Sequence, residues 1–135
     1  MRVFLDTNVL VSAFASRGLC ADLLELVLLE HDLLTGRHVL RELAKALREK
    51  LKLPATRVAE IVEFVSGDAV QVVQMPVAVR ARVDRDDALV LGEAVAGRAD
   101  VFVTGDGGLL SLRSLDPLRI VAPRQLWEIL RRGGE

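Results

Sequence analysis

The sequence predicts an α/β fold with a central parallel sheet of about five strands and helices on both faces. Short apolar runs that read as buried strands alternate with longer segments whose apolar residues recur at helical spacing. Two of these runs lead into an aspartate, Asp6 and Asp106. Strands that alternate with helices usually form a parallel sheet that is buried on both faces.

The bulk composition fits one compact domain over residues 1–135, with 51% hydrophobic and 4% aromatic residues. The single cysteine, Cys20, cannot form an internal disulfide. No signal peptide is apparent and no run approaches the length of a membrane span, so we expect a cytoplasmic protein without a membrane partner. The net charge of −1 argues against a generally basic nucleic-acid binder, but not against a nuclease with an acidic site.

The first part of the chain predicts two strands separated by two helices. Asp6 and Thr7 can cap the first helix, which breaks near Gly18, and Gly36 closes the second strand. These elements are, in order, a strand at 2–5, a helix at 9–14, a helix at about 20–30 and a strand at 32–35.

The middle of the chain predicts two more helices and a strand. The first helix starts at Arg37 and carries Val39, Leu43 and Leu47 at helical spacing. Pro54 marks a break or the start of the next helix. That next helix is expected to end at Gly67, and residues 70–73 follow as a strand.

The last part of the chain predicts a helix, two strands and a final helix. Asp86 or Asp87 starts the first helix, which stops at Gly97. Residues 100–104 form a strand that ends in a glycine-rich turn. The remaining elements are a strand at 119–121 and a helix that Pro123 opens.

Four acidic residues are candidates for one shared site. Asp6 and Asp106 follow strands, Glu42 lies on the helix after the second strand, and Asp87 lies at a helix start. The carboxyl ends of neighbouring parallel strands share one edge of the sheet, where ligands bind. Clustered carboxylates persist only if some are protonated or a cation is bound, and an oxygen-only set favours Mg²⁺ or Mn²⁺. Neither histidine, His31 or His38, is expected beside these acids.

Each acid also has a purely structural interpretation. Asp6 is as well explained as a helix cap as a metal ligand, and Glu42 alone is more readily a solvated helix residue. Asp84, Asp86 and Asp87 can be a capping cluster, and Asp106 can be a turn residue. The shared site is favoured because one parallel sheet would bring the two aspartates at strand ends and the two acids on helices together. The side chains expected to support it are Asn8, Ser12 and Thr104.

These motifs resemble the PIN domain family. The resemblance lies in Asp6-Thr7-Asn8-Val9, Glu42 on a helix, Asp87 at a helix start, Thr104-Gly105-Asp106 and the final Pro-Arg-Gln-Leu-Trp helix, and it covers nearly the whole chain. The chain is especially similar to bacterial and archaeal PIN proteins that act as toxins of toxin–antitoxin pairs (VapC-like).

The resemblance implies a Mg²⁺- or Mn²⁺-dependent single-strand endoribonuclease that forms homodimers and is blocked by a cognate antitoxin. It implies that Asp6, Glu42, Asp87 and Asp106 are the catalytic residues and metal ligands, although Asp84 and Asp86 compete with Asp87.

The alternatives are a PIN-fold RNA-processing nuclease that is not a toxin, and a catalytically silent RNA- or protein-binding module. A phospho-aspartate phosphatase is disfavoured because Asn8 stands where an Asp-x-Asp motif needs its second acid.

Overall fold

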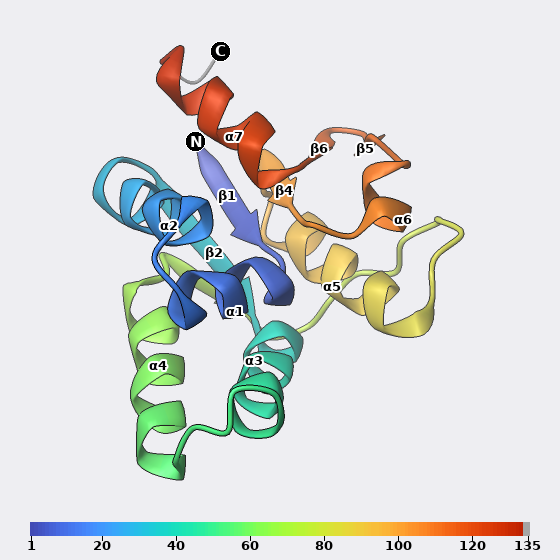
Figure 1. Ribbon diagram of the computed structural model, residues 1–135. Coiled ribbons are helices and arrows are strands. Elements are labelled where there is room, and N and C mark those ends of the chain that lie inside the picture. The colour runs from blue at the N-terminus through green and yellow to red at the C-terminus, as the bar shows by residue number, and fades with distance from the viewer. Residues whose placement is uncertain (134–135) are drawn as a thin grey trace.

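The computed structural model describes residues 1–133, which form seven helices and six strands (Figure 1). In chain order these are β1 (Arg2–Leu5), α1 (Thr7–Ala15), α2 (Leu19–Glu30), β2 (Asp32–Gly36), α3 (Arg37–Glu49), α4 (Ala55–Asp68), β3 (Gln71–Val73), α5 (Arg85–Ala96), β4 (Val101–Val103), α6 (Gly107–Leu110), β5 (Ser114–Leu115), β6 (Leu118–Val121) and α7 (Pro123–Arg131). Across residues 1–133, no helix combines the length and apolar character that crossing a membrane requires.

The strands form one sheet in the order β3-β2-β1-β4-β6-β5. All neighbours in it are parallel except β5 and β6, which pair antiparallel at one edge. The structure confirms the predicted α/β fold with helices flanking the sheet, which is mostly parallel and gains an antiparallel edge strand, β5, that the prediction of about five parallel strands did not include. The chain builds outward from β1 through β2 to β3, then crosses to the other side of β1 and adds β4 and β6. The order therefore reverses between β1 and β4, and ligands of open parallel sheets bind at such a switch point.

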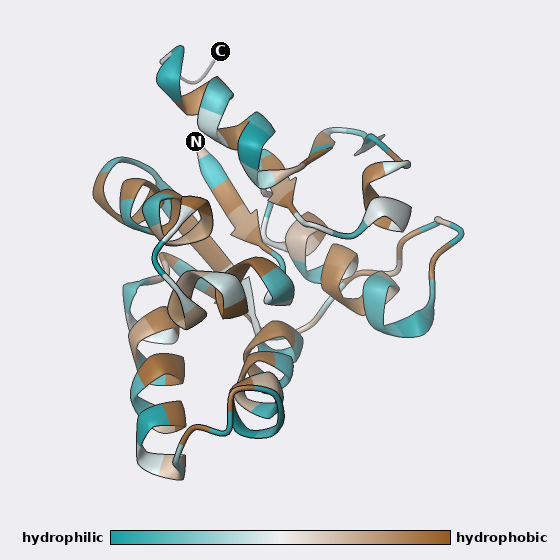
Figure 2. Cartoon of the chain, in the orientation of Figure 1, coloured by the Kyte–Doolittle hydropathy of each residue, from teal (hydrophilic) through white to brown (hydrophobic). Residues whose placement is uncertain are grey.

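The central strands are buried in the core. Val3, Phe4 and Leu5 of β1 have no exposed surface, and the ring of Phe4 stacks on Phe102 of β4 at a centroid distance of 5.7 Å. Figure 2 shows a nearly continuous hydrophobic β1, whereas α3 alternates between hydrophobic and hydrophilic residues. The buried residues of α3 are Val39, Leu43 and Leu47, spaced four residues apart as predicted. This packing fixes the carboxyl ends of β1 and β4 side by side.

Several element boundaries differ from the sequence predictions. Helix α5 begins at Arg85, because Asp84 is its N-cap and accepts a hydrogen bond from the backbone N–H of Asp87 at 2.8 Å. The predicted start at Asp86 or Asp87 is therefore wrong. Helix α4 continues through Gly67 to Asp68. The four-residue α6 and the two-residue β5 were not predicted, because neither is long enough to show a hydrophobic period.

Candidate active site

The ends of β1 and β4 bring two predicted acids together. Asp6 directly follows β1, and its backbone N–H donates to the carbonyl of Val103 in β4 at 2.9 Å. Asp106 lies three residues beyond Val103 and caps α6 by accepting a hydrogen bond from the N–H of Gly108 at 2.8 Å. Both carboxylates thus lie at the switch point of the sheet.

Asp6 is buried and held by hydrogen bonds to both carboxylate oxygens. Oδ1 accepts from the backbone N–H of Thr7 at 2.8 Å, and Oδ2 accepts from the hydroxyl of Thr104 at 2.7 Å. The Asn8 amide nitrogen lies 3.5 Å from the same Oδ2. The hydroxyl of Thr104 also accepts from the N–H of Asp106 at 3.1 Å. Thr104 therefore connects the two acidic segments, which is the orienting position the sequence suggested for it.

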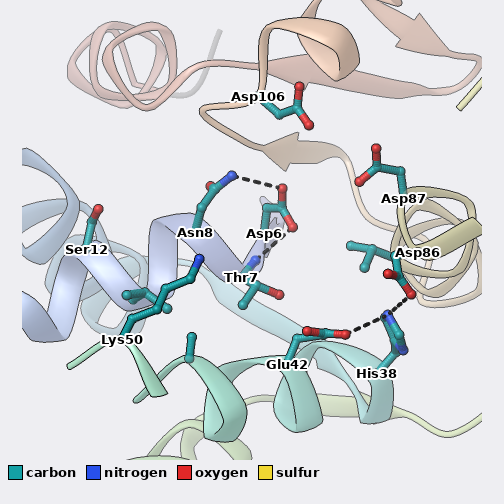
Figure 3. Close-up of a pocket in the computed structure, with 13 residues that line it drawn as sticks. Asp6, Thr7, Asn8, Ser12, His38, Glu42, Lys50, Asp86, Asp87 and Asp106 are labelled. Carbon is teal, nitrogen blue, oxygen red and sulfur yellow. Dashed lines mark hydrogen bonds and ion pairs between the residues drawn. The ribbon is translucent and has the colours of Figure 1, made fainter. Parts of the chain in front are cut away.

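The four predicted acids line one pocket of about 430 Å³ (Figure 3). Asp6 and Asp106 come from strand ends, Glu42 from α3 and Asp87 from α5. The pocket is also lined by Thr7, Asn8, Val11, Ser12, His38, Ala46, Lys50, Asp86 and Val90. Ser12 lies one turn after Asn8 on α1. Thr104 is fully buried behind Asp6.

The acidic residues of the pocket lie close together, and two of them, Asp6 and Asp87, have raised pKa values. Burial raises the pKa of Asp6, hydrogen bonds from Thr104 and Thr7 lower it, and the charge of Asp106 raises it further. Burial and the charges of neighbouring acids raise the pKa of Asp87 to about 6. Those neighbours, in decreasing order of effect, are Asp84, Asp106, Asp6 and Asp86. A bound cation would relieve this repulsion.

Asp84, Asp86 and Asp87, the three candidates for the third metal ligand, lie in different places in the structure. Asp84 caps α5 and does not line the pocket, whereas Asp86 and Asp87 both do. In Figure 3 the Asp87 carboxylate points toward Asp106 and Asp6, and the charges of these two acids add to the effects of burial and Asp84 on its pKa. Asp86 lies beside His38 instead, with 3.5 Å between Oδ1 and Nε2.

The expectation that neither histidine lies beside the acids is wrong for His38. Its Nε2 lies 3.8 Å from Oε1 of Glu42 as well as near Asp86. The sequence could have predicted this contact, because His38 and Glu42 are four residues apart on a predicted helix and therefore lie on the same face of it.

A buried glutamate that sequence reasoning missed joins α5 to α3. Glu93 is 1% exposed, and its carboxylate accepts hydrogen bonds from the backbone N–H groups of His38 at 2.7 Å and Val39 at 3.3 Å. A Cβ at Gly36 would collide with this carboxylate, so glycine permits the close approach. Burial raises the pKa of Glu93, while these two hydrogen bonds lower it. Glu93 thus positions the start of the helix that carries Glu42.

Basic residues gather in a neighbouring cavity that shares His38, Glu42 and Asp86 with the acidic pocket. They lie on α3 and at the start of α5: Arg41, Lys45, Arg48 and Arg85. Lys50 is the one lysine or arginine among the described residues that line the acidic pocket itself. An acidic pocket beside a basic cavity suits a polyanion that is held next to a cation.

The donor set of the acidic pocket fits a divalent cation. Carboxylate oxygens are the preferred ligands of Mg²⁺ and Mn²⁺. The charge of Asp106 raises the pKa of both Asp6 and Asp87, after the larger effect of burial on each. Glu42 lines the same pocket from the opposite helix. These four side chains are the ones that would hold the ion.

The fold and the pocket define a parallel α/β protein with an acidic site at its switch point. A family model of the PIN domain matches residues 2–107, a span that contains all four acids. The chain therefore belongs to the PIN domain family, whose members are generally nucleases that use divalent metals.

Comparison with solved structures gives a match of the same fold. A chain of the VapBC2 assembly from Rickettsia felis, solved bound to a DNA fragment from its promoter, matches 90% of this chain and 98% of its own length. The TM-score is 0.67 and the sequence identity is 16%, so this likeness shows the fold. The comparison with curated proteins found no match.

Proposed function

We propose that this chain is a single-domain, divalent-metal-dependent endoribonuclease that cleaves single-stranded RNA in the cytoplasm. The observation that carries the proposal is the convergence of Asp6, Glu42, Asp87 and Asp106 in one pocket at the switch point. Membership of a family of nucleases supports hydrolysis of a phosphodiester as the reaction. The basic cavity beside the pocket supports a nucleic-acid strand as the substrate.

In this proposal, Asp6, Asp87 and Asp106 hold the metal, and Glu42 either joins them as a ligand or positions and deprotonates a water molecule. A bound Mg²⁺ or Mn²⁺ supplies positive charge that neutralises the phosphate and lowers the pKa of water. Glu42 takes a proton from the water, and the water oxygen bonds to phosphorus in line with the leaving 3′ oxygen. The P–O3′ bond breaks and the leaving oxygen takes up a proton from solvent water. The products carry a 5′-phosphate and a 3′-hydroxyl.

We further propose that the chain is the toxin of a type II toxin–antitoxin pair and forms homodimers. The similarity of its fold to a chain of the VapBC2 assembly supports this assignment. A toxin is distinguished from an RNA-processing nuclease by growth arrest when the chain is expressed alone. A catalytically silent module would bind metal or RNA without cutting.

The proposed site is tested by Asp6→Asn, with Asp68→Asn as the matched control on an exposed helix position. Asparagine is also a good helix cap and can still accept from Thr7, so the fold is expected to persist. We expect cleavage of single-stranded RNA to fall below roughly 1% of the parental rate, the scale of losing one key electrostatic contact in a transition state. Asp68→Asn should cut at the parental rate. Parental activity in a folded Asp6→Asn chain would show that the site is wrong.

A further inference from the structure

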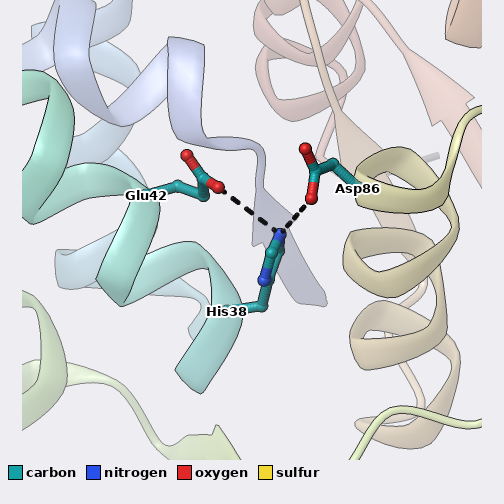
Figure 4. A group of neighbouring side chains, drawn as sticks. All are labelled: His38, Glu42 and Asp86. Atoms are coloured by element: carbon teal, nitrogen blue, oxygen red, sulfur yellow. Dashed lines mark ion pairs between the residues drawn. The ribbon is translucent and has the colours of Figure 1, made fainter.

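A second group of possible metal ligands lies at the rim of the acidic pocket (Figure 4). His38 and Glu42 are one turn apart on α3, and Asp86 faces them from the first turn of α5. One ligand atom from each residue lies within 4.8 Å of the other two. Nε2 of His38 is 3.8 Å from Glu42 Oε1 and 3.5 Å from Asp86 Oδ1.

The central atom of this group is buried and lacks a hydrogen bond. Nε2 of His38 has no hydrogen-bond partner among the described residues, and the side chain is 14% exposed. A polar atom that is buried without a partner costs free energy unless some ligand satisfies it. The backbone N–H of His38 is held by Glu93, which anchors the residue that carries the ring.

The spacing of these atoms is close to that of ligands around one ion. Two ligand atoms that each lie about 2.1 Å from a shared metal are roughly 3.0–3.4 Å apart. The two distances from Nε2 exceed this range only slightly, and Asp86 is an exposed side chain that is free to move closer. A small adjustment of the carboxylates would complete the arrangement.

We propose that His38, Glu42 and Asp86 form a second divalent-cation site that prefers Mn²⁺ or another first-row transition ion to Mg²⁺. The preference follows from the imidazole nitrogen, because nitrogen ligands favour transition ions and Mg²⁺ favours oxygen. The group formed by Asp6, Asp87 and Asp106 offers oxygen alone. Glu42 borders both groups, so a transition ion would sit next to the proposed catalytic ion. The proposal concerns binding and does not depend on nuclease activity.

The competing explanation is that a protonated His38 simply pairs with the two carboxylates. The two explanations differ in whether His38 affects the binding of Mn²⁺. Binding of Mn²⁺ to the whole chain without RNA can be measured by electron paramagnetic resonance, for the parent and for His38→Gln. His31→Gln is the matched control, because the chain has only these two histidines and His31 does not line the pocket.

We expect the parent to bind Mn²⁺ at a site from which an equal concentration of Mg²⁺ does not displace it. His38→Gln should weaken this binding at least tenfold, His31→Gln should not change it, and Asp6→Asn should retain it. Asp86→Asn should also weaken Mn²⁺ binding at least tenfold. Because Asp86 is an exposed side chain, this variant shows that the loss in His38→Gln does not come from misfolding. Equal Mn²⁺ binding by the parent and folded His38→Gln, loss of all Mn²⁺ binding in Asp6→Asn, or absence of Mn²⁺ binding by the parent would each overturn the proposal. Failure of RNA cleavage would leave this test unaffected.

Discussion

At the scale of single residues, the cap role and the proposed ligand role of Asp6 are compatible. Its carboxylate caps α1 through Thr7 and accepts from Thr104, yet two carboxylate oxygens offer about four acceptor positions. Lone pairs therefore remain for a cation. Asp106 repeats the arrangement, because it caps α6 through Gly108 while it lines the pocket. The aspartates that follow β1 and β4 thus each cap a helix and also place a carboxylate in the pocket.

The raised pKa of Asp87 predicts that this residue destabilises the metal-free fold at neutral pH. The carboxyl titrates near pH 6 in the folded chain and near 3.8 when unperturbed, so the folded state resists its ionisation. The penalty is full above pH 6, decreases as the pH falls toward 3.8, and is absent below that value. We expect Asp87→Asn to raise the free energy of unfolding at pH 7.5 by roughly 1–2 kcal/mol, less than the full conversion of the shift because solvent screens a partly exposed group.

Urea unfolding of metal-free protein at pH 7.5 and pH 4 measures this effect. The stabilisation should be present at pH 7.5 and much smaller at pH 4, where the parental carboxyl is protonated in the folded state and only partly ionised in the unfolded state. Asp68→Asn is again the control, since its side chain is remote from the pocket. An Asp87→Asn chain that is less stable than the parent at pH 7.5 would contradict the repulsion described here.

At the scale of elements, the junction of β2 and α3 depends on one buried ionisable side chain from α5. Glu93 accepts from the first N–H groups of α3, where a negative charge also favours the helix dipole. The neighbouring Gly36 leaves room for the carboxylate. This contact fixes the relative positions of α3 and α5, which carry Glu42 and Asp87. The arrangement of the site therefore rests on a residue that lines no part of the pocket.

A double-mutant cycle tests this contact. Gly36→Ala should destabilise the fold by roughly 1–3 kcal/mol, because the added methyl group collides with the Glu93 carboxylate. Glu93→Ala should cost a similar amount, since it leaves the N–H groups of His38 and Val39 unpaired. In the Glu93→Ala background, Gly36→Ala should cost far less. Urea unfolding of the four chains measures the coupling, and strictly additive effects would mean that the two residues do not interact.

The sequence predicted the elements whose hydrophobic pattern is long and missed those that depend on tertiary contacts. All of β4 and the last three residues of β1 are apolar, and α3 shows a clear period of Val39, Leu43 and Leu47. The four acids could be predicted because each follows a strand or a helical signal. Glu93 could not, because a single charge within α5 reveals its partner only once the helices are packed. The contact of His38 with Glu42 could have been predicted, because the two residues are four positions apart on a predicted helix, and the prediction for His38 was wrong.

At the scale of the whole molecule, the reversal of strand order around β1 brings together acids from distant parts of the sequence. The chain places β2 on one side of β1 and β4 on the other, and α3 and α5 lie next to each other beside the sheet. Residues 6, 42, 87 and 106 consequently meet although they span most of the chain. The basic cavity adjoins this meeting point, so a bound strand would cross from one to the other.

The proposed homodimer is testable through the apolar surface of α2. Leu29 is 74% exposed, and Leu19 at the other end of the helix is 37% exposed. We expect the parent to sediment at about twice its chain mass of 14.8 kDa. Leu29→Glu should shift the protein toward monomer by placing a charge in the contact, whereas Glu30→Gln on the same helix should not. A parental chain that is monomeric at micromolar concentration would contradict the dimer.

The dependence of RNA cleavage on added metal tests the central claim most directly. The parental chain is freed of metal and incubated with an end-labelled single-stranded RNA, alone, with Mn²⁺, with Mn²⁺ plus excess chelator, and after Mn²⁺ is restored. We predict cleavage only in the two reactions that contain available Mn²⁺, with products that carry a 5′-phosphate and a 3′-hydroxyl. Cleavage at an equal rate in the presence of the chelator would contradict the acidic metal site.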